Sequence, residues 1–262
     1  WISFLLLSLT LLNLTTLSLT RTGVLGGGPI VLSRWLCFGA VVVLFHPKIK
    51  RFKILYILLF LFAALFTGSR GPILSFFLVM FLFSFLNFRK LFLRILSISS
   101  LIIFFLFITG AIDQLSQYKN VARVFMNLQE GGLMKSTGRS YFFESSVQEI
   151  IAHPFGVGSG NFVEYTDNPA FFKNKNLDYP HNLFFEIATE FGIISLLLFL
   201  IYLIQSIYLS IKMNVLNRLH IGGNMMFYTF VFLFLNSMIS GDLNDARLFL
   251  VFIPLMLVKE IE

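Results

Sequence analysis

Long runs of apolar residues, separated by short polar connectors, make up most of this chain of 262 residues. A helix needs about 20 apolar residues to cross the hydrocarbon core of a bilayer, and somewhat fewer where the bilayer thins or flanking side chains snorkel. Eight runs approach that length: Trp1 to Leu19, Val31 to Phe45, Ile54 to Phe66, Ile73 to Leu86, Ile95 to Ile112, Leu183 to Ser210, Met225 to Ile239, and Leu248 to Val258. The pattern predicts an all-α polytopic membrane protein with about eight transmembrane helices.

The composition agrees with this pattern, because 57% of the residues are hydrophobic and only 13% are charged. Water-soluble domains contain fewer apolar and about twice as many charged residues. The net charge of +7 would suggest nucleic acid as a partner of a soluble domain, but no nucleic-acid-binding motif accompanies it. We therefore expect membrane lipids, and no nucleic acid, as partners. A single cysteine excludes an intramolecular disulfide.

The positions of the basic residues predict the topology. If all eight runs cross, ten basic residues fall on one side: Lys48, Lys50, Arg51, Lys53, Arg89, Lys90, Arg94, Lys212, Arg218 and Lys259. The opposite short connectors and helix ends contain four: Arg21, Arg34, Arg70 and Arg247. The C-terminus is then cytoplasmic. The chain starts inside an apolar run, so we expect residues 1–262 to form one transmembrane domain whose N-terminal helices are missing, as in the C-terminal part of a longer protein.

One connector, Asp113 to Pro180, is much longer than the others and falls on the outer side of the membrane. Loops of this length are usually functional or disordered. Residues 140–152 alternate apolar and polar positions at helical spacing, which predicts an amphipathic helix that ends before Pro154. The sequence "GVGSGNF" follows it. Because no strand precedes these glycines, they predict a turn rather than a dinucleotide-binding loop.

Four polar residues lie at the start of the sixth apolar run: His181, Asn182, Glu186 and Glu190. The last three follow at i, i+4 and i+8, so they form one stripe on a helix that Pro180 would begin. Carboxylates facing lipid cost roughly 3 kcal/mol each, so the stripe should face the protein interior or water. We expect Asn182, Glu186 and Glu190 to bind substrate. The alternatives are that the carboxylates only pair with arginines of neighbouring helices, and that His181 is a plain interfacial residue.

Three arginines of the outer side are candidates for binding phosphate, because a guanidinium stays charged and makes paired hydrogen bonds. Arg70 lies between Gly68 and Gly71 in "FTGSRGPIL", Arg139 opens the amphipathic helix, and Arg21 ends the first run. Alternatives remain for each. Arg70 could contact lipid headgroups, and Arg139 could be a solvated loop charge.

A metal site is not predicted. Asp242 and Asp245, in "SGDLNDARL", could in principle bind a divalent cation with Asn244, but their spacing matches no known binding loop. We interpret them as a helix cap next to Arg247.

Three segments, in this order, resemble the bacterial O-antigen ligase and O-antigen polymerase superfamily: "TGSRGPIL", "TGRSYFFESSVQEIIAHPFGVGSGNF" and "HNLFFEIATEFGIISLLLF". The similarity extends from about Ile54 to the C-terminus. Its most specific part is the combination of "HPFGVGSGNF" with "HN...E...EFG" about 20 residues later. Each half alone would be a weak signal.

The resemblance implies a glycosyltransferase of the bacterial inner membrane whose active face is periplasmic or external. Its donor would be a glycan linked to undecaprenyl diphosphate, and its acceptor a hydroxyl of a glycan or of lipid A core, with no cofactor and no metal. By the same resemblance, Arg70 and Arg139 would bind the diphosphate and His181 would assist the acceptor hydroxyl. A neutral imidazole can accept that proton near pH 7. Glu186 or Glu190 would orient His181 or bind acceptor hydroxyls.

Polymerase and ligase differ only in the acceptor. We favour the polymerase because the long connector shows no evident docking surface for a bulky lipid core. The alternative from another class is a transporter or flippase of the lipid-linked glycan. That function predicts ionisable residues near the membrane midplane, whereas the charges here cluster at the outer ends of the apolar runs.

Overall fold

The computed structural model describes residues 1–13, 28–46, 49, 51–87, 139–167, 179–216, 221–239, 242–243 and 245–255. Within these ranges the secondary structure is helical and contains no strand, which confirms the predicted all-α class. The predicted run 95–112, Arg21 and residues 113–138 of the long connector lie outside the described residues.

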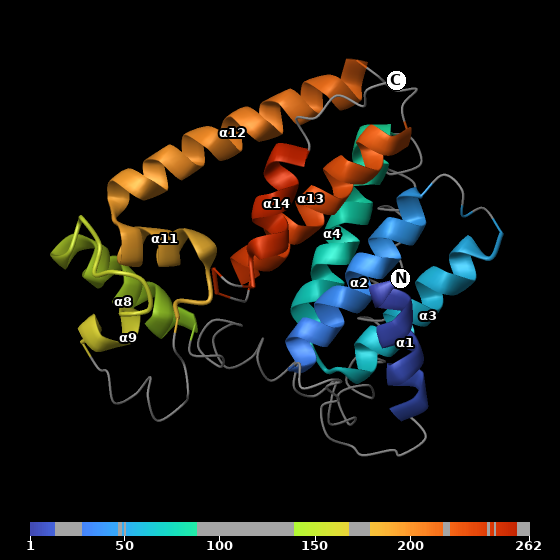
Figure 1. Cartoon of the computed structure of the whole chain (residues 1–262), viewed down its shortest axis with the longest axis horizontal. Coiled ribbons are helices and arrows are strands. Elements are labelled where there is room, and N and C mark those ends of the chain that lie inside the picture. Colours follow the sequence, from blue (N-terminus) through green and yellow to red (C-terminus); the bar gives the residue numbers. More distant parts are fainter. Residues whose placement is uncertain are drawn as a thin grey trace, which may run out of the picture.

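Six of the described helices pack into a bundle around α2, which contacts α1, α3, α4 and α13 (Figure 1). Their bounds are α1 Ile2–Asn13, α2 Pro29–Phe45, α3 Lys53–Phe66, α4 Arg70–Asn87, α13 Ile221–Ile239 and α14 Arg247–Leu255. Aromatic rings fill much of the core. Phe45 stacks on Tyr228 with 4.5 Å between ring centroids, and Phe83 meets Phe45 edge-on at 5.0 Å. Such offset and edge-on pairs add to the free energy of burial.

The remaining described helices form a second group beside the bundle (Figure 1). They are α8 Arg139–Ala152, α9 Phe162–Tyr165, α11 Leu183–Phe191 and α12 Ile193–Leu216. Helix α8 packs against α11, and α12 continues from α11 to contact α13 and α14. The predicted helix is confirmed as α8, which ends two residues before Pro154. Its buried face is not the predicted apolar one, because Ser146 and Glu149 are buried whereas Phe143 and Ile151 are exposed.

The sixth apolar run is not one helix, so its predicted extent from Leu183 to Ser210 was wrong. It is divided at Gly192, where φ is +87° and ψ is 170°. A helix requires φ near −60°, so the chain changes direction there. The polar stripe therefore belongs to the short helix α11, and the uninterrupted apolar segment begins with α12.

The bundle helices follow the predicted apolar runs closely. The runs that begin at Val31, Ile54 and Ile73 correspond to helices that start one to three residues earlier, at Pro29, Lys53 and Arg70. In the described ranges, no helix has both the length and the apolar composition that a membrane crossing needs. The eight crossings and the topology therefore stay predictions.

Several helix ends meet at one end of the bundle, where α2, α4 and α14 begin and α13 ends. The Ser33 hydroxyl of α2 donates to the carbonyl of Ser69, 3.4 Å away, just before α4. A side chain at Gly71 would lie 3.0 Å from Ile239, at the end of α13. The helix N-termini present unpaired backbone N–H groups here, which favour negatively charged partners.

Candidate functional site

The glycine-rich turn that follows α8 docks on the C-terminal end of α11. The backbone N–H groups of Val157 and Gly158 donate to the carbonyls of Thr189 and Glu190, both at 2.9 Å. The N–H of Ile193 donates to the carbonyl of Pro154 at 2.9 Å. The last carbonyls of a helix have no partner within the helix, so this turn satisfies them. The segments "HPFGVGSGNF" and "HN...E...EFG", which each gave a weak signal alone, thus form one structural unit.

Two glycines make this docking possible. A Cβ atom at Gly156 would lie 2.5 Å from the carbonyl oxygen of Glu190, and one at Gly192 would lie 2.6 Å from the carbonyl carbon of Phe155. Both residues also have positive φ, at +86° and +87°. Any other residue would be strained in its backbone and would collide with the opposite segment.

Three carboxylates are buried where α8 meets α11: Glu149, Glu186 and Glu190 are 3%, 4% and 5% exposed. The Glu190 carboxylate accepts hydrogen bonds from the N–H of Gly160 and the hydroxyl of Ser159, both in the glycine-rich turn. The predicted stripe thus does face the protein interior. Within the described residues, no arginine pairs with Glu186 or Glu190, so the alternative of a purely structural pairing finds no support there.

Sequence reasoning missed Glu149. Both of its carboxylate oxygens are buried without a hydrogen-bond partner among the described residues, and the same is true of the Ser146 hydroxyl one turn earlier. Burial, and then repulsion by Glu190, raises the pKa of Glu149 to about 8. The only sequence feature that could have indicated its burial was its place in the predicted helix 140–152. A carboxylate in a 68-residue connector is ordinarily expected to be exposed.

His181 is held in an unusual backbone conformation next to this cluster. Its φ is +59°, a left-handed value that is uncommon for residues other than glycine. The imidazole meets the ring of Phe142 from α8 edge-on at 4.8 Å and the ring of Tyr179 at 4.3 Å. Such strain persists only where the surroundings over-determine it, and it is typical of functional sites. The structure therefore brings His181 together with α8, which opens at Arg139.

Asn182 caps helix α11. Its side-chain oxygen accepts from the N–H groups of Phe184 and Phe185 at 2.9 and 3.3 Å, and its amide nitrogen donates to the carbonyl of Met238 at 3.1 Å. Both ends of the amide thus have partners in the protein. This cap fixes where α11 starts and ties it to α13. The predicted substrate contact of Asn182 stays a prediction.

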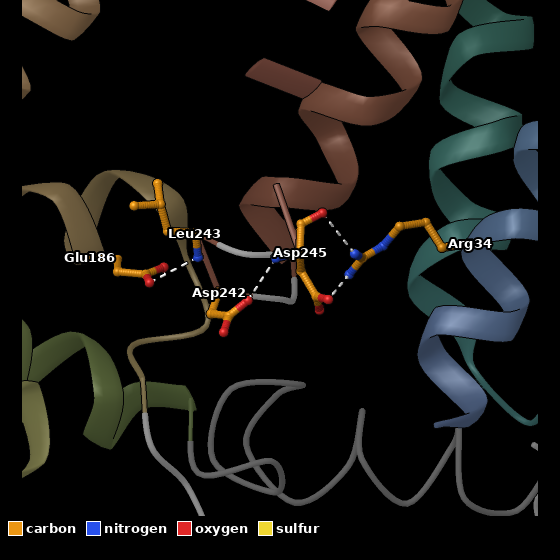
Figure 2. A network of polar contacts seen from close by, with 5 residues as sticks. All are labelled: Arg34, Glu186, Asp242, Leu243 and Asp245. Atoms are coloured by element: carbon orange, nitrogen blue, oxygen red, sulfur yellow. Dashed lines mark hydrogen bonds and ion pairs between the residues drawn. The ribbon is translucent and has the colours of Figure 1, made fainter. Parts of the chain in front are cut away.

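A polar network connects α11 to α2 through the turn between α13 and α14 (Figure 2). Glu186 Oε1 accepts from the N–H of Leu243 at 2.8 Å, and Asp242 Oδ1 accepts from the N–H of Asp245 at 2.7 Å. Arg34 of α2 donates to both the backbone carbonyl and the carboxylate of Asp245, at 3.3 and 3.4 Å. The turn is thus fixed by α11 on one side and by α2 on the other.

In this network the Asp242 side chain closes the turn that leads into α14, and the Asp245 carboxylate pairs with Arg34. The interpretation of the two aspartates as a cap of the helix itself stays an interpretation. In the part of the chain that is described, no group of three or more histidine, cysteine or carboxylate side chains could hold a metal ion. The second oxygen of Glu186, Oε2, is buried and has no partner among the described residues.

Burial, and then the carboxylates of Asp245 and Asp242, raises the pKa of Tyr179 to about 12. Tyr179 is therefore within electrostatic reach of the turn between α13 and α14, while its ring contacts His181. The turn and the His181 segment belong to one polar region.

Of the three arginines predicted to bind phosphate, only Arg70 has a described side chain. Arg70 is the first residue of α4 and is exposed, next to the contact between Gly71 and Ile239. Arg139 is the first residue of α8, but its side chain is not among those described, and Arg21 lies outside the described residues. Arg34 and Arg247 of the same end of the bundle were counted only as topology charges in the sequence. The contact of Arg34 with Asp245 joins residues 211 positions apart and has no sequence signal.

Comparison with known proteins supports the resemblance seen in the motifs. In a comparison with curated proteins, no match was found. The family model described as O-antigen ligase matches residues 54–200, which include Arg70, Arg139, His181 and all three buried carboxylates. This match covers more than half of the chain. The chain therefore belongs to the O-antigen ligase family, whose members are bacterial membrane proteins of lipopolysaccharide and polysaccharide biosynthesis.

Proposed function

We propose that this protein is a glycosyltransferase that moves an oligosaccharide from undecaprenyl diphosphate to an acceptor sugar hydroxyl at the periplasmic face of the bacterial inner membrane. Family membership supports transfer of the O-antigen ligase or polymerase type. In this proposal the apolar bundle helices and α12 span the membrane, and α8, α9 and α11 lie at its outer surface.

The observation that supports this proposal most directly is the docking of the glycine-rich turn on α11. It joins α8 to α11, which carry the buried carboxylates, and the strained His181 just before α11 contacts Phe142 of α8. A site built from two segments with a rigid connection can hold a general base within the narrow tolerance that proton transfer requires.

The transfer needs few chemical groups. The bond between the anomeric carbon of the donor glycan and the diphosphate oxygen breaks, and the acceptor oxygen forms a new bond to that carbon. His181 takes the hydroxyl proton, while the electron pair leaves with undecaprenyl diphosphate. Arg70 and Arg139 stabilise the charge that develops on the diphosphate, which is the main requirement because diphosphate is already a good leaving group.

We infer that the acceptor is the growing glycan itself, as in a polymerase, because the described part of the 113–180 connector forms two short helices and a turn packed on α11. A ligase acting on lipid A core is the alternative within the same chemistry. A flippase is less well supported, because the buried carboxylates of the described residues lie in α8 and α11 and not in the bundle helices.

A glycan ladder tests the function. A deletion strain is complemented with full-length wild type, His181→Ala or Arg70→Ala, and membrane levels of each protein are measured on the same samples. We expect both variants to abolish transfer while they remain in the membrane. His46→Ala is the matched control, because His46 follows the C-terminal end of α2, and this variant should restore the ladder. A near-normal ladder from either site variant would remove that residue from the mechanism.

The deletion itself distinguishes the acceptors. Single repeat units on the lipid core indicate a polymerase, whereas accumulation of lipid-linked polymer with no repeat units on the core indicates a ligase. An unchanged ladder contradicts both and favours a transporter. Arg139→Lys should also lose most activity, because lysine lacks the planar fork that binds phosphate. A fully active lysine variant would contradict the role of Arg139.

A further inference from the structure

A cavity of about 130 Å³ opens between α2, α13 and α14, next to the polar network of Figure 2. Its polar walls are Arg34, Asp245 and Arg247, and its aromatic walls are Trp35 and Phe38. Trp35 and Phe38 meet edge-on, with 5.7 Å between ring centroids. This cavity belongs to none of the groups assigned above to the transfer reaction.

Its walls combine three kinds of group that recognise sugars. Arg34 and Arg247 can donate hydrogen bonds, and Asp245 can accept them, so a ring hydroxyl finds both of the partners it needs. The aromatic rings can cover the apolar C–H face of the same sugar. The Arg34 side chain is only 11% exposed and is held by its ion pair with Asp245, so these groups are positioned before a ligand arrives.

Other ligands fit these walls less well. Asp245 would repel a phosphate group, and its ion pair neutralises Arg34. A lipid chain would leave two guanidinium groups and a carboxylate against hydrocarbon, which is unfavourable. The volume corresponds to about four water molecules at roughly 30 Å³ each. One face of a single sugar ring can enter a cavity of that size, and a whole repeat unit cannot.

The cavity is connected to the proposed active site. Asp245 lines the cavity and acts electrostatically on Tyr179, whose ring contacts the imidazole of His181. Leu243 of the same turn donates a hydrogen bond to Glu186 of α11. A glycan with one residue in the cavity could therefore extend along the turn toward α11.

We propose that this cavity is a sugar-binding subsite that holds one ring of the glycan at a distance from the reacting bond. The proposal rests on the proposed function for the identity of the glycan, but it concerns binding and not transfer. The subsite favours a neutral sugar, because Asp245 neutralises Arg34 and would repel an acidic group.

The fluorescence of Trp35 tests the subsite directly. The full-length protein is prepared with every tryptophan except Trp35 replaced by phenylalanine, and its glycan ladder is checked for retained function. The probe is the oligosaccharide repeat released from the surface polysaccharide of the source strain and freed of lipid and phosphate. We expect a saturable change in Trp35 emission, because a sugar stacked on the indole excludes water from it.

Two variants keep the test independent of folding. Arg247→Gln removes a charge at the exposed start of α14 and should weaken binding of the oligosaccharide about tenfold, since hydrogen bonds to charged groups contribute roughly that factor. Arg51→Gln removes the same charge from an exposed residue at the opposite end of the bundle and should leave the affinity unchanged. Equal affinities of the two variants would contradict the subsite.

Separate titrations with inorganic diphosphate and with detergent-dispersed undecaprenyl phosphate complete the test. A response of Trp35 to either of these, and not to the oligosaccharide, overturns the proposal, and so does the absence of any response. If Trp35 is silent while His181→Ala still abolishes the ladder, only the subsite fails. If Trp35 responds while the deletion leaves the ladder unchanged, the proposed function fails and the sugar-binding site stands.

Discussion

The bundle of α1 to α4, α13 and α14 and the neighbouring layer of α8, α9 and α11 bury polar groups in opposite ways. In the bundle, the buried polar side chains are mainly hydroxyls that hydrogen-bond within their own helix. Thr10, Thr67 and Ser75 donate to carbonyls three or four residues earlier, at 2.7, 2.7 and 3.1 Å. Such groups need no partner from elsewhere in the molecule.

The layer instead buries carboxylates. Glu149, Glu186 and Glu190 are at most 5% exposed. Glu186 and Glu190 accept hydrogen bonds from other segments, whereas Glu149 has no partner among the described residues. The separate apolar cluster of the layer contains only three buried residues, Phe142, Phe162 and Val163. Burying a charged or polar group without a partner is costly, and the bundle provides the stability that tolerates it.

The two regions therefore have different roles. The bundle is a scaffold that would form from many apolar sequences, whereas the layer depends on particular residues at particular backbone angles. Most of the unpartnered buried polar atoms among the described residues, those of Ser146, Glu149 and Glu186, lie in the layer, and so does the close backbone contact of Gly156 with Glu190. These features are typical of functional sites.

The largest effect should come from Gly156→Ala, which separates the glycine-rich turn from α11 within the layer. The added Cβ would lie 2.5 Å from the Glu190 carbonyl oxygen, at a residue with φ of +86°. We expect a loss of about 3 kcal/mol or more in the free energy of unfolding of the layer, together with loss of transfer. The rate of limited proteolysis within residues 139–167 measures this loss of stability.

Gly160→Ala is the matched control for this change. Gly160 also has positive φ, at +76°, but nothing lies within 4 Å of its Cβ position. The backbone strain alone should cost about 1–2 kcal/mol. If both variants resist protease equally, the docking of the turn on α11 does not hold the layer in place.

A smaller effect is expected from Asn182→Ala, which removes the cap that joins the layer to the bundle. Loss of an N-cap side chain costs about 1 kcal/mol. Asn182→Asp keeps the oxygen that accepts from Phe184 and Phe185 and loses only the hydrogen bond to Met238. We expect thermal unfolding to rank wild type above Asp and Asp above Ala, with transfer retained in the Asp variant. Loss of transfer in a stable Asp variant would favour the substrate contact instead.

A further effect depends on pH and concerns Glu149→Gln. The pKa of this carboxyl is 4.5 in the unfolded reference and about 8 in the folded protein. As pH rises through this window, the unfolded chain loses the proton first, so the wild type becomes less stable. Glutamine has no proton to lose, so the variant should gain about 1 kcal/mol relative to wild type for each pH unit between pH 5 and pH 8, or roughly 3 kcal/mol in total.

Thermal unfolding at the two pH values measures this effect. A gain of 1 kcal/mol corresponds to about 2–4 °C in Tm for a chain of this size. A Tm difference between the variant and wild type that is the same at pH 5 and pH 8 would show that Glu149 is not buried as a neutral acid.

Much of the fold follows from local patterns. The apolar runs became helices because their backbone hydrogen bonds form within each segment, and Pro154 and the glycines after it stop α8 where expected. The division of the sixth run was not predicted, because Gly192 in "EFGII" looks like a tolerated helical glycine until its close contact with Phe155 is known.

Some residues of the candidate site could likewise be predicted from local patterns, and others could not. The residue types and spacing indicated His181, Asn182, Glu186 and Glu190, because a polar stripe on an apolar segment is visible in one dimension. Glu149 looked like an ordinary loop carboxylate, and only the packing of α8 on α11 buried it.

Local patterns in the sequence specify that this chain is helical, which segments are apolar and which motifs place it in its family. Those properties depend on residues within a few turns of one another. The contact of Arg34 with Asp245 and the docking of the glycine-rich turn on α11 follow from the three-dimensional packing. Contacts between distant segments depend on shape and on backbone angles, which no local pattern specifies.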